Sequence, residues 1–303
     1  MPRIDASTPL RSMLFSPGSS EKMVAKASVS GADAALFDLE DSVAPDMKEK
    51  AREIVAEAIG ATRAAAGAPP VILVRVNGTE TDLLEGDLEA ITSEGLDGIF
   101  LPKPESAAGV RAADAIFSRL ERERGLEEGG IGIIAQMESA AGVHRCFEIC
   151  SASPRVVGVN FGSAEDADFC RDLGAQWTPE GTALLYARSK VLLEARAAGL
   201  HHPTDGVYMR LKDDDGCRAD ALAAKQLGYV GKAAIHPRQV PIFNEVYSPS
   251  AEEVDYYTGM LEAFREGEKA GLGAITYQGK MIDVAMAKHA ENVIARARTI
   301  SAL

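Results

Sequence analysis

The sequence predicts an α/β protein, a (β/α)8 TIM barrel with a C-terminal helical extension. Eight short apolar runs alternate with longer stretches of helical spacing, the pattern typical of parallel βαβ units. The 303 residues exceed the roughly 250 of an ordinary barrel of this kind. An open, doubly wound sheet is the alternative, and we disfavour it because no early run leads into a GxGxxG helix start.

The expected strands and helices follow one another in a regular order. The strands are Arg11–Pro17, Ala34–Asp41, Val71–Asn77, Gly98–Lys103, Ile131–Glu138, Val156–Gly162, the weaker Gly206–Arg210 and Gly231–Pro237. Between them, helical spacing is clearest over Lys48–Ala66 and Ala183–Ala198. These elements place the barrel domain at residues 1–247.

Residues 248–303 are expected to form the C-terminal extension. A helix is predicted over Ala251–Ala270, a short strand or turn over Ile275–Gly279, and a last helix over about Met281–Arg298. A segment beyond a complete barrel has to pack somewhere. We expect it to act as a lid or to contact a neighbouring subunit.

Composition and charge exclude several classes of protein. A hydrophobic fraction of 46% with 25% charged residues is typical of a folded globular chain. The net charge of −13 argues against general nucleic-acid or membrane partners, since such a surface repels phosphate groups. The four cysteines form no disulfide pattern. With no long apolar segment and no signal-like start, we expect a soluble, most simply cytoplasmic protein.

Charged and polar side chains end most of the expected strands, where barrel enzymes carry their active sites. They are Glu40, Asp41, Arg75, Asn77, Lys103, Glu138, the acidic stretch Glu165–Asp168, and His236. Glu138 and one acid of that stretch would suit Mg²⁺, which takes one or two protein carboxylates. Arg75 would neutralise an oxyanion or hold a carboxylate. For Asp41 and Asp168, a solvated helix cap is an equal alternative. The residues alone thus predict a magnesium enzyme with a small anionic substrate and leave the reaction open.

Further motifs run through almost the whole chain. They are Arg11–Gly18 with Lys22, Phe37–Val43, Val74–Asn77, Leu101–Lys103, Met137–Val143, Thr178–Gly181, Gly231–Pro237, Tyr247–Ser250 and Tyr277–Asp283. As an ordered set they resemble the citrate lyase β-subunit-like proteins of the HpcH/HpaI aldolase superfamily. The last three are most similar to the citramalyl-CoA lyase branch.

This resemblance implies a carbon–carbon lyase that depends on Mg²⁺, with Mn²⁺ as a possible replacement. Its substrate would be a 3-hydroxyacyl-CoA carboxylate of the citramalyl-CoA or malyl-CoA type, so CoA enters as part of the substrate. The products would be acetyl-CoA and a 2-oxo acid, pyruvate or glyoxylate, in a reaction that can be reversible. The family's fold is the same barrel, and its members are commonly homo-oligomers, trimers or hexamers.

The resemblance also implies residue roles. It assigns the metal to Glu138 and Asp166, substrate contact to Arg75, and supporting acids to Glu40 and Asp41. Asp283 would be an acid/base group donated from a neighbouring subunit, and capping of the last helix is the alternative for this residue.

The sequence departs from the family pattern in two places. The loop after the sixth strand has extra residues, so counting back from Gly174 selects Asp168 instead of Asp166. We favour Asp166 because its Ala-Glu-Asp triplet is intact. The second departure is Tyr208–Arg210, where relatives often carry an acid, which affects the shape of the acyl pocket.

The CoA phosphates require cationic contacts. Arg11, Lys22 and Lys26, expected near the exit of the first strand, are the candidates, with solvated surface charges as the alternative for each.

Three other functions are compatible with the same motifs. The first is a malyl-CoA thioesterase or malate-synthase-like enzyme, and the second is a citrate lyase β subunit acting on an acyl-carrier protein. The third is a metabolite-binding protein without turnover. The long tail carrying Asp283 favours a free-standing enzyme.

Overall fold

The structure is a computed structural model that describes residues 1–65 and 68–301. The chain divides into two compact units, Met1–Val246 and Tyr247–Leu303. The division falls one residue before the expected boundary.

The first unit contains a closed barrel of eight parallel strands in sequential order, with β8 paired to β1. The predicted TIM barrel is therefore confirmed. Its strands are β1 (Ser12–Pro17), β2 (Ala34–Asp38), β3 (Val71–Arg75), β4 (Gly98–Pro102), β5 (Gly132–Met137), β6 (Val156–Phe161), β7 (His202–Asp205) and β8 (Gly231–Ala234).

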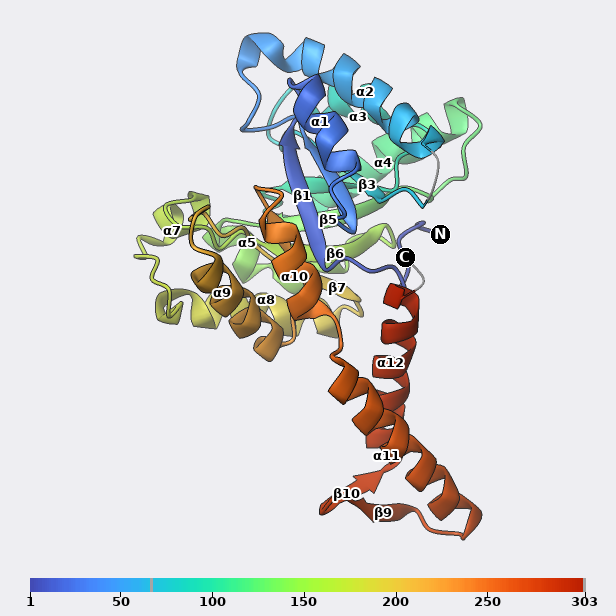
Figure 1. Cartoon of the computed structure of the whole chain (residues 1–303). Coiled ribbons are helices and arrows are strands. Elements are labelled where there is room, and N and C mark those ends of the chain that lie inside the picture. The colour runs from blue at the N-terminus through green and yellow to red at the C-terminus, as the bar shows by residue number, and fades with distance from the viewer. Residues whose placement is uncertain (66–67, 302–303) are drawn as a thin grey trace. The chain divides into compact units, whose positions relative to one another are not determined.

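Helices connect the strands and lie around the outside of the barrel (Figure 1). They are α1 (Glu21–Ser28), α2 (Lys48–Ala64), α3 (Leu84–Ile91), α4 (Ala107–Glu123), α5 (Ala140–His144), α6 (Cys146–Cys150), α7 (Asp168–Leu173), α8 (Leu185–Ala197), α9 (Asp214–Leu227) and α10 (Gln239–Tyr247), with short 3-10 turns at Pro45–Met47 and Thr182–Leu184. The expected end of the second helix, Ala66, lies outside the described residues. Within residues 1–65 and 68–301, no helix is long and apolar enough to cross a membrane.

The barrel strands are apolar because they are covered on both faces. All five positions of β2 are buried, as expected for a parallel strand enclosed by the barrel interior and the outer helices. Met13, Leu36, Leu73, Phe100 and Ile134, from five successive strands, pack into one cluster. This core fixes the strands, and hence the positions of the residues that follow them.

The seventh strand differs from its prediction. It is His202–Asp205, and the expected Gly206–Arg210 is the loop that follows it. Pro203 is the one apolar residue of the strand, yet all four residues are buried, and the polar side chains have partners inside the protein. Asp205 accepts hydrogen bonds from Lys232 Nζ (2.5 Å) and Arg188 Nη2 (3.0 Å), and Thr204 donates to the carbonyl of Val159.

The second unit is a helical hairpin with a small sheet. It contains α11 (Ala251–Lys269), β9 (Ala274–Tyr277), β10 (Lys280–Asp283) and α12 (Val284–Ser301). Ser250 begins α11 with a capping box that Glu253 completes. Phe264 and Ile282 lie in a separate apolar core. The last helix starts three residues later than expected because 280–283 pair with β9.

Candidate active site

A cavity of about 440 Å³ lies at the carboxyl ends of the barrel strands. Asp38, Arg75, Gln136, Glu138 and Asp168 contribute its polar walls, and Phe15, Val207, Met209 and Ile235 contribute apolar ones. The predicted gathering of strand-end residues at one rim is therefore present, because the strands that carry them are neighbours in the barrel.

Arg75 is held by Asp38 across two adjacent strands. The two residues end β3 and β2 and stand opposite each other in the strand register. Arg75 Nε and Nη2 donate to the two Asp38 oxygens at 2.7 and 2.6 Å, and the guanidinium lies over the ring of Phe15. Burial alone would raise the pKa of Asp38, but the hydrogen bonds and charge of Arg75 outweigh it and hold that pKa below its usual value. Donors on the other edge of the guanidinium face Glu40.

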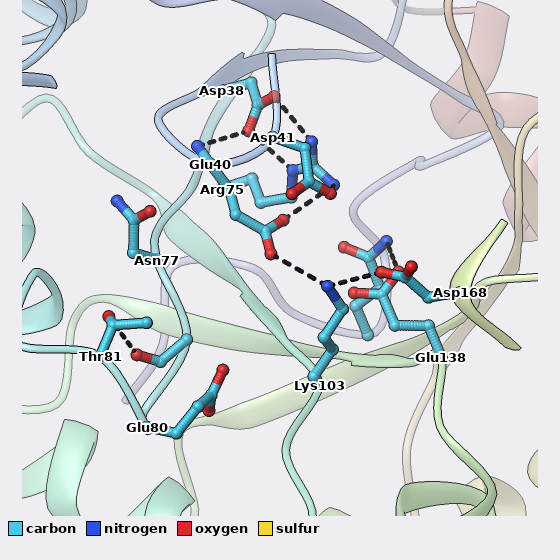
Figure 2. Close-up of polar contacts among 12 residues, drawn as sticks. Asp38, Glu40, Asp41, Arg75, Asn77, Glu80, Thr81, Lys103, Glu138 and Asp168 are labelled. Carbon is cyan, nitrogen blue, oxygen red and sulfur yellow. Dashed lines mark hydrogen bonds and ion pairs between the residues drawn. The ribbon is translucent and has the colours of Figure 1, made fainter. Parts of the chain in front are cut away.

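Glu40 lies between two cations. Its Oε2 is 3.0 Å from Arg75 Nη1, and its Oε1 is 3.6 Å from Lys103 Nζ. Burial, together with the charge of Asp41, raises its pKa to about 7, although Arg75 and Lys103 oppose the rise. Asp41 is exposed, lies 3.8 Å from Arg75 Nη1, and lines the cavity. Figure 2 shows these acids around Arg75.

Hydrogen bonds from the side chains of Lys48 and Asn77 fix the backbone of the loop that carries Glu40. Lys48 Nζ donates to the carbonyls of Leu39 (2.6 Å) and Glu40 (2.8 Å) and to Asn77 Oδ1 (2.9 Å). Asn77 Nδ2 donates to Leu39 O at 3.1 Å and to Asp87 at 2.6 Å. The asparagine after β3 therefore shapes the neighbouring loop.

Glu138 follows β5 and is buried, with 7% of its surface exposed. Gln136 Nε2 donates to its Oε2 at 3.0 Å, whereas its Oε1 is buried without a hydrogen-bond partner. Burial, together with the charge of the nearby Glu40, raises the pKa of Glu138 to about 8 against the opposing charges of Arg75 and Lys103. Gly162 packs so closely that a Cβ there would lie 2.7 Å from the Cβ of Glu138.

Asp168, and not Asp166, shares the cavity with Glu138. Asp168 begins α7, lines the cavity and pairs with Lys103 Nζ at 2.5 Å. Asp166 occupies a left-handed turn at φ 56° and is exposed outside the cavity walls. Our preference for Asp166 is not met in this structure, because the residues added to the loop place the start of α7 at the rim. The hydrogen bond from Lys103 lowers the pKa of Asp168.

The donor set suits a divalent cation. A buried carboxylate with an unpartnered oxygen is costly, and a bound cation removes that cost. Among the described residues, no group of three or more His, Cys, Asp and Glu side chains is arranged for a metal. A pair of carboxylates with water is the arrangement that Mg²⁺ commonly uses.

The remaining predicted residues lie elsewhere. Arg11 precedes β1 at the opposite end of the barrel and is buried against Asp33, with donor–acceptor distances of 2.8 and 2.6 Å. Its predicted role near the exit of the first strand is therefore wrong. Lys22 and Lys26 are exposed on α1, the helix whose Met23 lines the cavity. Asp283 is in the second unit, where its Oδ1 accepts from the backbone N–H of Ala285 and Met286 at the start of α12.

Several residues that shape the site received no role from the sequence. Asp38 orients Arg75, Gln136 orients Glu138, and Lys103 connects Glu40 with Asp168. Gln136 and Asp38 are the polar exceptions in otherwise apolar strands. That exception is the signal that would have identified them.

The fold and the cavity define a class: a TIM-barrel enzyme whose rim combines a fixed arginine with buried carboxylates. Comparison with known proteins identifies the family. Residues 11–237 match the family model HpcH/HpaI aldolase/citrate lyase. This chain belongs to that family, and it is an enzyme of the lyase class.

Relatives align with nearly the whole chain. The citrate lyase subunit beta of Escherichia coli K12 is 37% identical, over 95% of this chain and 93% of that protein. In Cereibacter sphaeroides, an L-malyl-CoA/beta-methylmalyl-CoA lyase is 35% identical and a (3S)-malyl-CoA thioesterase 36% identical, each over 97% of this chain and 96% of the relative. The crystal structure of CitE from Mycobacterium tuberculosis, in complex with magnesium, acetoacetate and coenzyme A, is 28% identical with a TM-score of 0.75, covering 97% of this chain and all of that one.

Proposed function

We propose that this protein is a Mg²⁺-dependent carbon–carbon lyase that cleaves a citramalyl-CoA or malyl-CoA type substrate to acetyl-CoA and pyruvate or glyoxylate. The observation that carries the proposal is the buried Glu138 carboxylate, which has an unpartnered oxygen and belongs to a residue that lines the same cavity as Asp168 and Arg75. A lyase relative that is named for malyl-CoA, and a solved relative with magnesium and coenzyme A, support it.

In this proposal Glu138 and Asp168 hold the cation, and Asp168 replaces Asp166 in that role. When bound, Mg²⁺ supplies Lewis-acid stabilisation to the hydroxyl and carboxylate oxygens of the substrate. Gln136 keeps the Glu138 carboxylate in place through its hydrogen bond. Glu40 and Asp41 act as supporting acids that balance the charge of Arg75.

Arg75 would hold the thioester oxygen, where negative charge develops as the carbon–carbon bond breaks. Its guanidinium stays charged at any working pH. Because Asp38 occupies the Nε and Nη2 edge, the substrate would be met by the remaining Nη donors. A donor that is already fixed needs no reorganisation during the reaction, which is the source of its effect on the rate.

Asp283 would deliver a proton to the enolate carbon of the departing acetyl-CoA in cleavage, and remove one in condensation. Within its own chain it caps α12. Exposed apolar side chains surround it, with Met281 at 69%, Val284 at 67% and Met286 at 44% exposure. Such a surface favours an intersubunit contact in a homo-oligomer, and the acid/base role requires that contact to place Asp283 beside a cavity.

The CoA phosphates would be met by Lys22 and Lys26. They are one helical turn apart and exposed on the helix that borders the cavity through Met23. Because both are solvated in this structure, each is expected to contribute modestly to binding.

Two alternatives remain open for experiment: thioester hydrolysis, and action within a citrate lyase complex on an acyl-carrier protein. The presence of the C-terminal segment does not distinguish these two functions from the proposed carbon–carbon lyase. The match to the Escherichia coli subunit covers 95% of the chain and thus extends well beyond residue 246. The segment that we expected to mark a free-standing enzyme is present in a complex subunit as well.

The test is a coupled assay of the purified protein with Mg²⁺, citramalyl-CoA and malyl-CoA, with detection of both acetyl-CoA and the 2-oxo acid. Glu138→Ala and Asp283→Asn variants are assayed in parallel. Equal release of both products by the wild type, lost in both variants, supports the proposal. Release of CoA without a 2-oxo acid would identify the protein as a thioesterase. Inactivity toward both esters would favour a citrate lyase subunit that acts on an acyl-carrier protein.

A further inference from the structure

Lys103 is the one cation in the described part of the chain that reaches from the Glu40 side of the cavity rim to the Asp168 side. Its Nζ is 2.5 Å from Asp168 Oδ2 and 3.6 Å from Glu40 Oε1. Figure 2 shows this ammonium between the two carboxylates, with Glu138 beside Asp168. Arg75, a second cation of the site, pairs on the opposite side of Glu40, with Asp38 and Glu40.

Both oxygens of Asp168 are engaged by cations. Lys103 contacts Oδ2, and Arg171 contacts Oδ1. A cation that binds Asp168 therefore has to share or displace one of them. The two contacts differ in strength, since the side chain of Lys103 is 30% exposed and that of Arg171 is 71% exposed. Water screens the Arg171 pair much more effectively.

The backbone at Lys103 shows that this placement is specified. Its φ is 46°, in the left-handed region, and Pro104 follows it. Glycine adopts that region without cost, whereas other residues do so only where the surroundings require it. A glycine would turn the chain after β4 equally well, but it would supply no ammonium to the carboxylates.

We propose that Lys103 is a tethered competitor of the divalent cation: its ammonium and the metal bind Asp168 alternatively, and metal binding transfers the ammonium to Glu40. The transfer is short, because Glu40 Oε1 is already within 3.6 Å of Nζ. Its result is that Glu40 and Asp168 each keep a counter-charge in either arrangement. Lys103 is thus a positioning residue that sets the metal affinity of the site. The inference rests on the metal site proposed above.

The test is the affinity of the full-length protein for Mn²⁺, measured by electron paramagnetic resonance of the free ion at low salt. Lys103→Met keeps the length of the side chain and removes its charge, and we expect it to bind Mn²⁺ about tenfold more tightly because the competitor is gone. Lys103→Arg retains a charge and should remain within about threefold of the wild type. Arg171→Gln, the matched control on the other oxygen of Asp168, should change affinity by less than about twofold because that pair is screened.

Thermal melting separates competition from a purely structural role. With a chelator present, Lys103→Met should melt below the wild type, because Glu40, Glu138 and Asp168 lose a counter-charge, and saturating Mn²⁺ should close that gap. A gap that stays the same with and without Mn²⁺, or unchanged or weaker Mn²⁺ binding by Lys103→Met, overturns the inference while the metal site stands. If Glu138→Gln binds Mn²⁺ as well as the wild type does, the proposed metal site is itself wrong, and the inference falls with it.

Discussion

At the scale of single residues, the proposed role of Glu138 as a metal ligand would link metal binding to pH. Its pKa is raised to about 8 by burial and by the charge of Glu40. A protonated carboxyl does not bind a metal, so metal binding has to displace that proton. The affinity for Mg²⁺ should therefore increase with pH up to about 8.

This argument gives the first prediction. As the pH falls from 8.5 to 6.5, the Mg²⁺ affinity should decrease, approaching about tenfold per pH unit where Glu138 is protonated. Isothermal titration calorimetry in two buffers of different ionisation enthalpy checks it, because proton release appears as a buffer-dependent heat. A constant affinity across this range would mean that Glu138 is already ionised before the metal binds.

Gly162 gives the second prediction, because the space beside Glu138 admits no side chain. A Cβ at Gly162 would lie 2.7 Å from the Glu138 Cβ and 3.4 Å from the Met137 carbonyl. Gly162→Ala should destabilise the fold by about 1–3 kcal/mol through overpacking and weaken Mg²⁺ binding at least tenfold by displacing the carboxylate.

The control for Gly162 is Gly60, in the middle of α2. A Cβ at Gly60 meets nothing within 4 Å. Gly60→Ala should stabilise the protein by about 0.5–1 kcal/mol through helix propensity and leave metal affinity unchanged. Urea unfolding and calorimetry measure both effects. If both alanine variants bind Mg²⁺ alike, the close contact at Gly162 does not position Glu138.

At the scale of elements, β7 is held by buried charge. Lys232 Nζ contacts Asp205 at 2.5 Å and Asp220 at 2.7 Å, and Arg188 pairs with the same two acids at 3.0 and 3.2 Å. The cluster fixes the end of β7 next to Ser163, whose hydroxyl donates to Asp205. It therefore fixes the start of the loop that leads to Asp168.

The third prediction is that Lys232→Met costs about 3–5 kcal/mol of unfolding free energy, because two buried carboxylates are left with a single counter-charge. The exposed pair of Arg218 with Glu245 is the comparison, with side chains 39% and 67% exposed. Arg218→Ala should cost at most about 1 kcal/mol. Urea denaturation of the two variants measures both losses of unfolding free energy. Equal denaturation midpoints for the two variants would contradict the role assigned to the cluster.

The contrast between strands buried by apolar residues and a strand buried by charged partners explains what could be predicted from the sequence. β2 and β3 were recognisable because strands covered on both faces consist of continuous apolar residues. β7 was misplaced because its burial depends on Lys232, Arg188 and Asp220, which are distant in sequence. The position of Glu138 in the cavity lining was predictable because the residue directly follows an apolar strand. Asp168 was ranked second because loop length, and not residue type, decides which acid of the Glu165–Asp168 stretch reaches the rim.

At the scale of the whole molecule, the residues proposed to take part in the reaction come from both units. Glu138 and Arg75 belong to the barrel, and Asp283 belongs to the second unit, where apolar residues around it are exposed. If Asp283 completes the site of a neighbouring subunit, neither unit is sufficient in one chain. Each site then takes its barrel from one copy and its acid from another.

This arrangement makes a complementation experiment decisive. Glu138→Gln and Asp283→Asn should each be inactive as homo-oligomers. Oligomers containing both variants at random and in equal amounts should recover about one quarter of the wild-type activity, because each site draws an intact barrel and an intact Asp283 independently. Co-expression of the two variants in equal amounts gives this random mixture, and its activity per site is then compared with that of the wild type. Mixed oligomers that remain inactive would place Asp283 at the cavity of its own chain, whereas an active Asp283→Asn homo-oligomer would place Asp283 outside the reaction. Asp283→Asn should retain the Mg²⁺ affinity of the wild type, because its carboxylate caps α12 and takes no part in holding the metal.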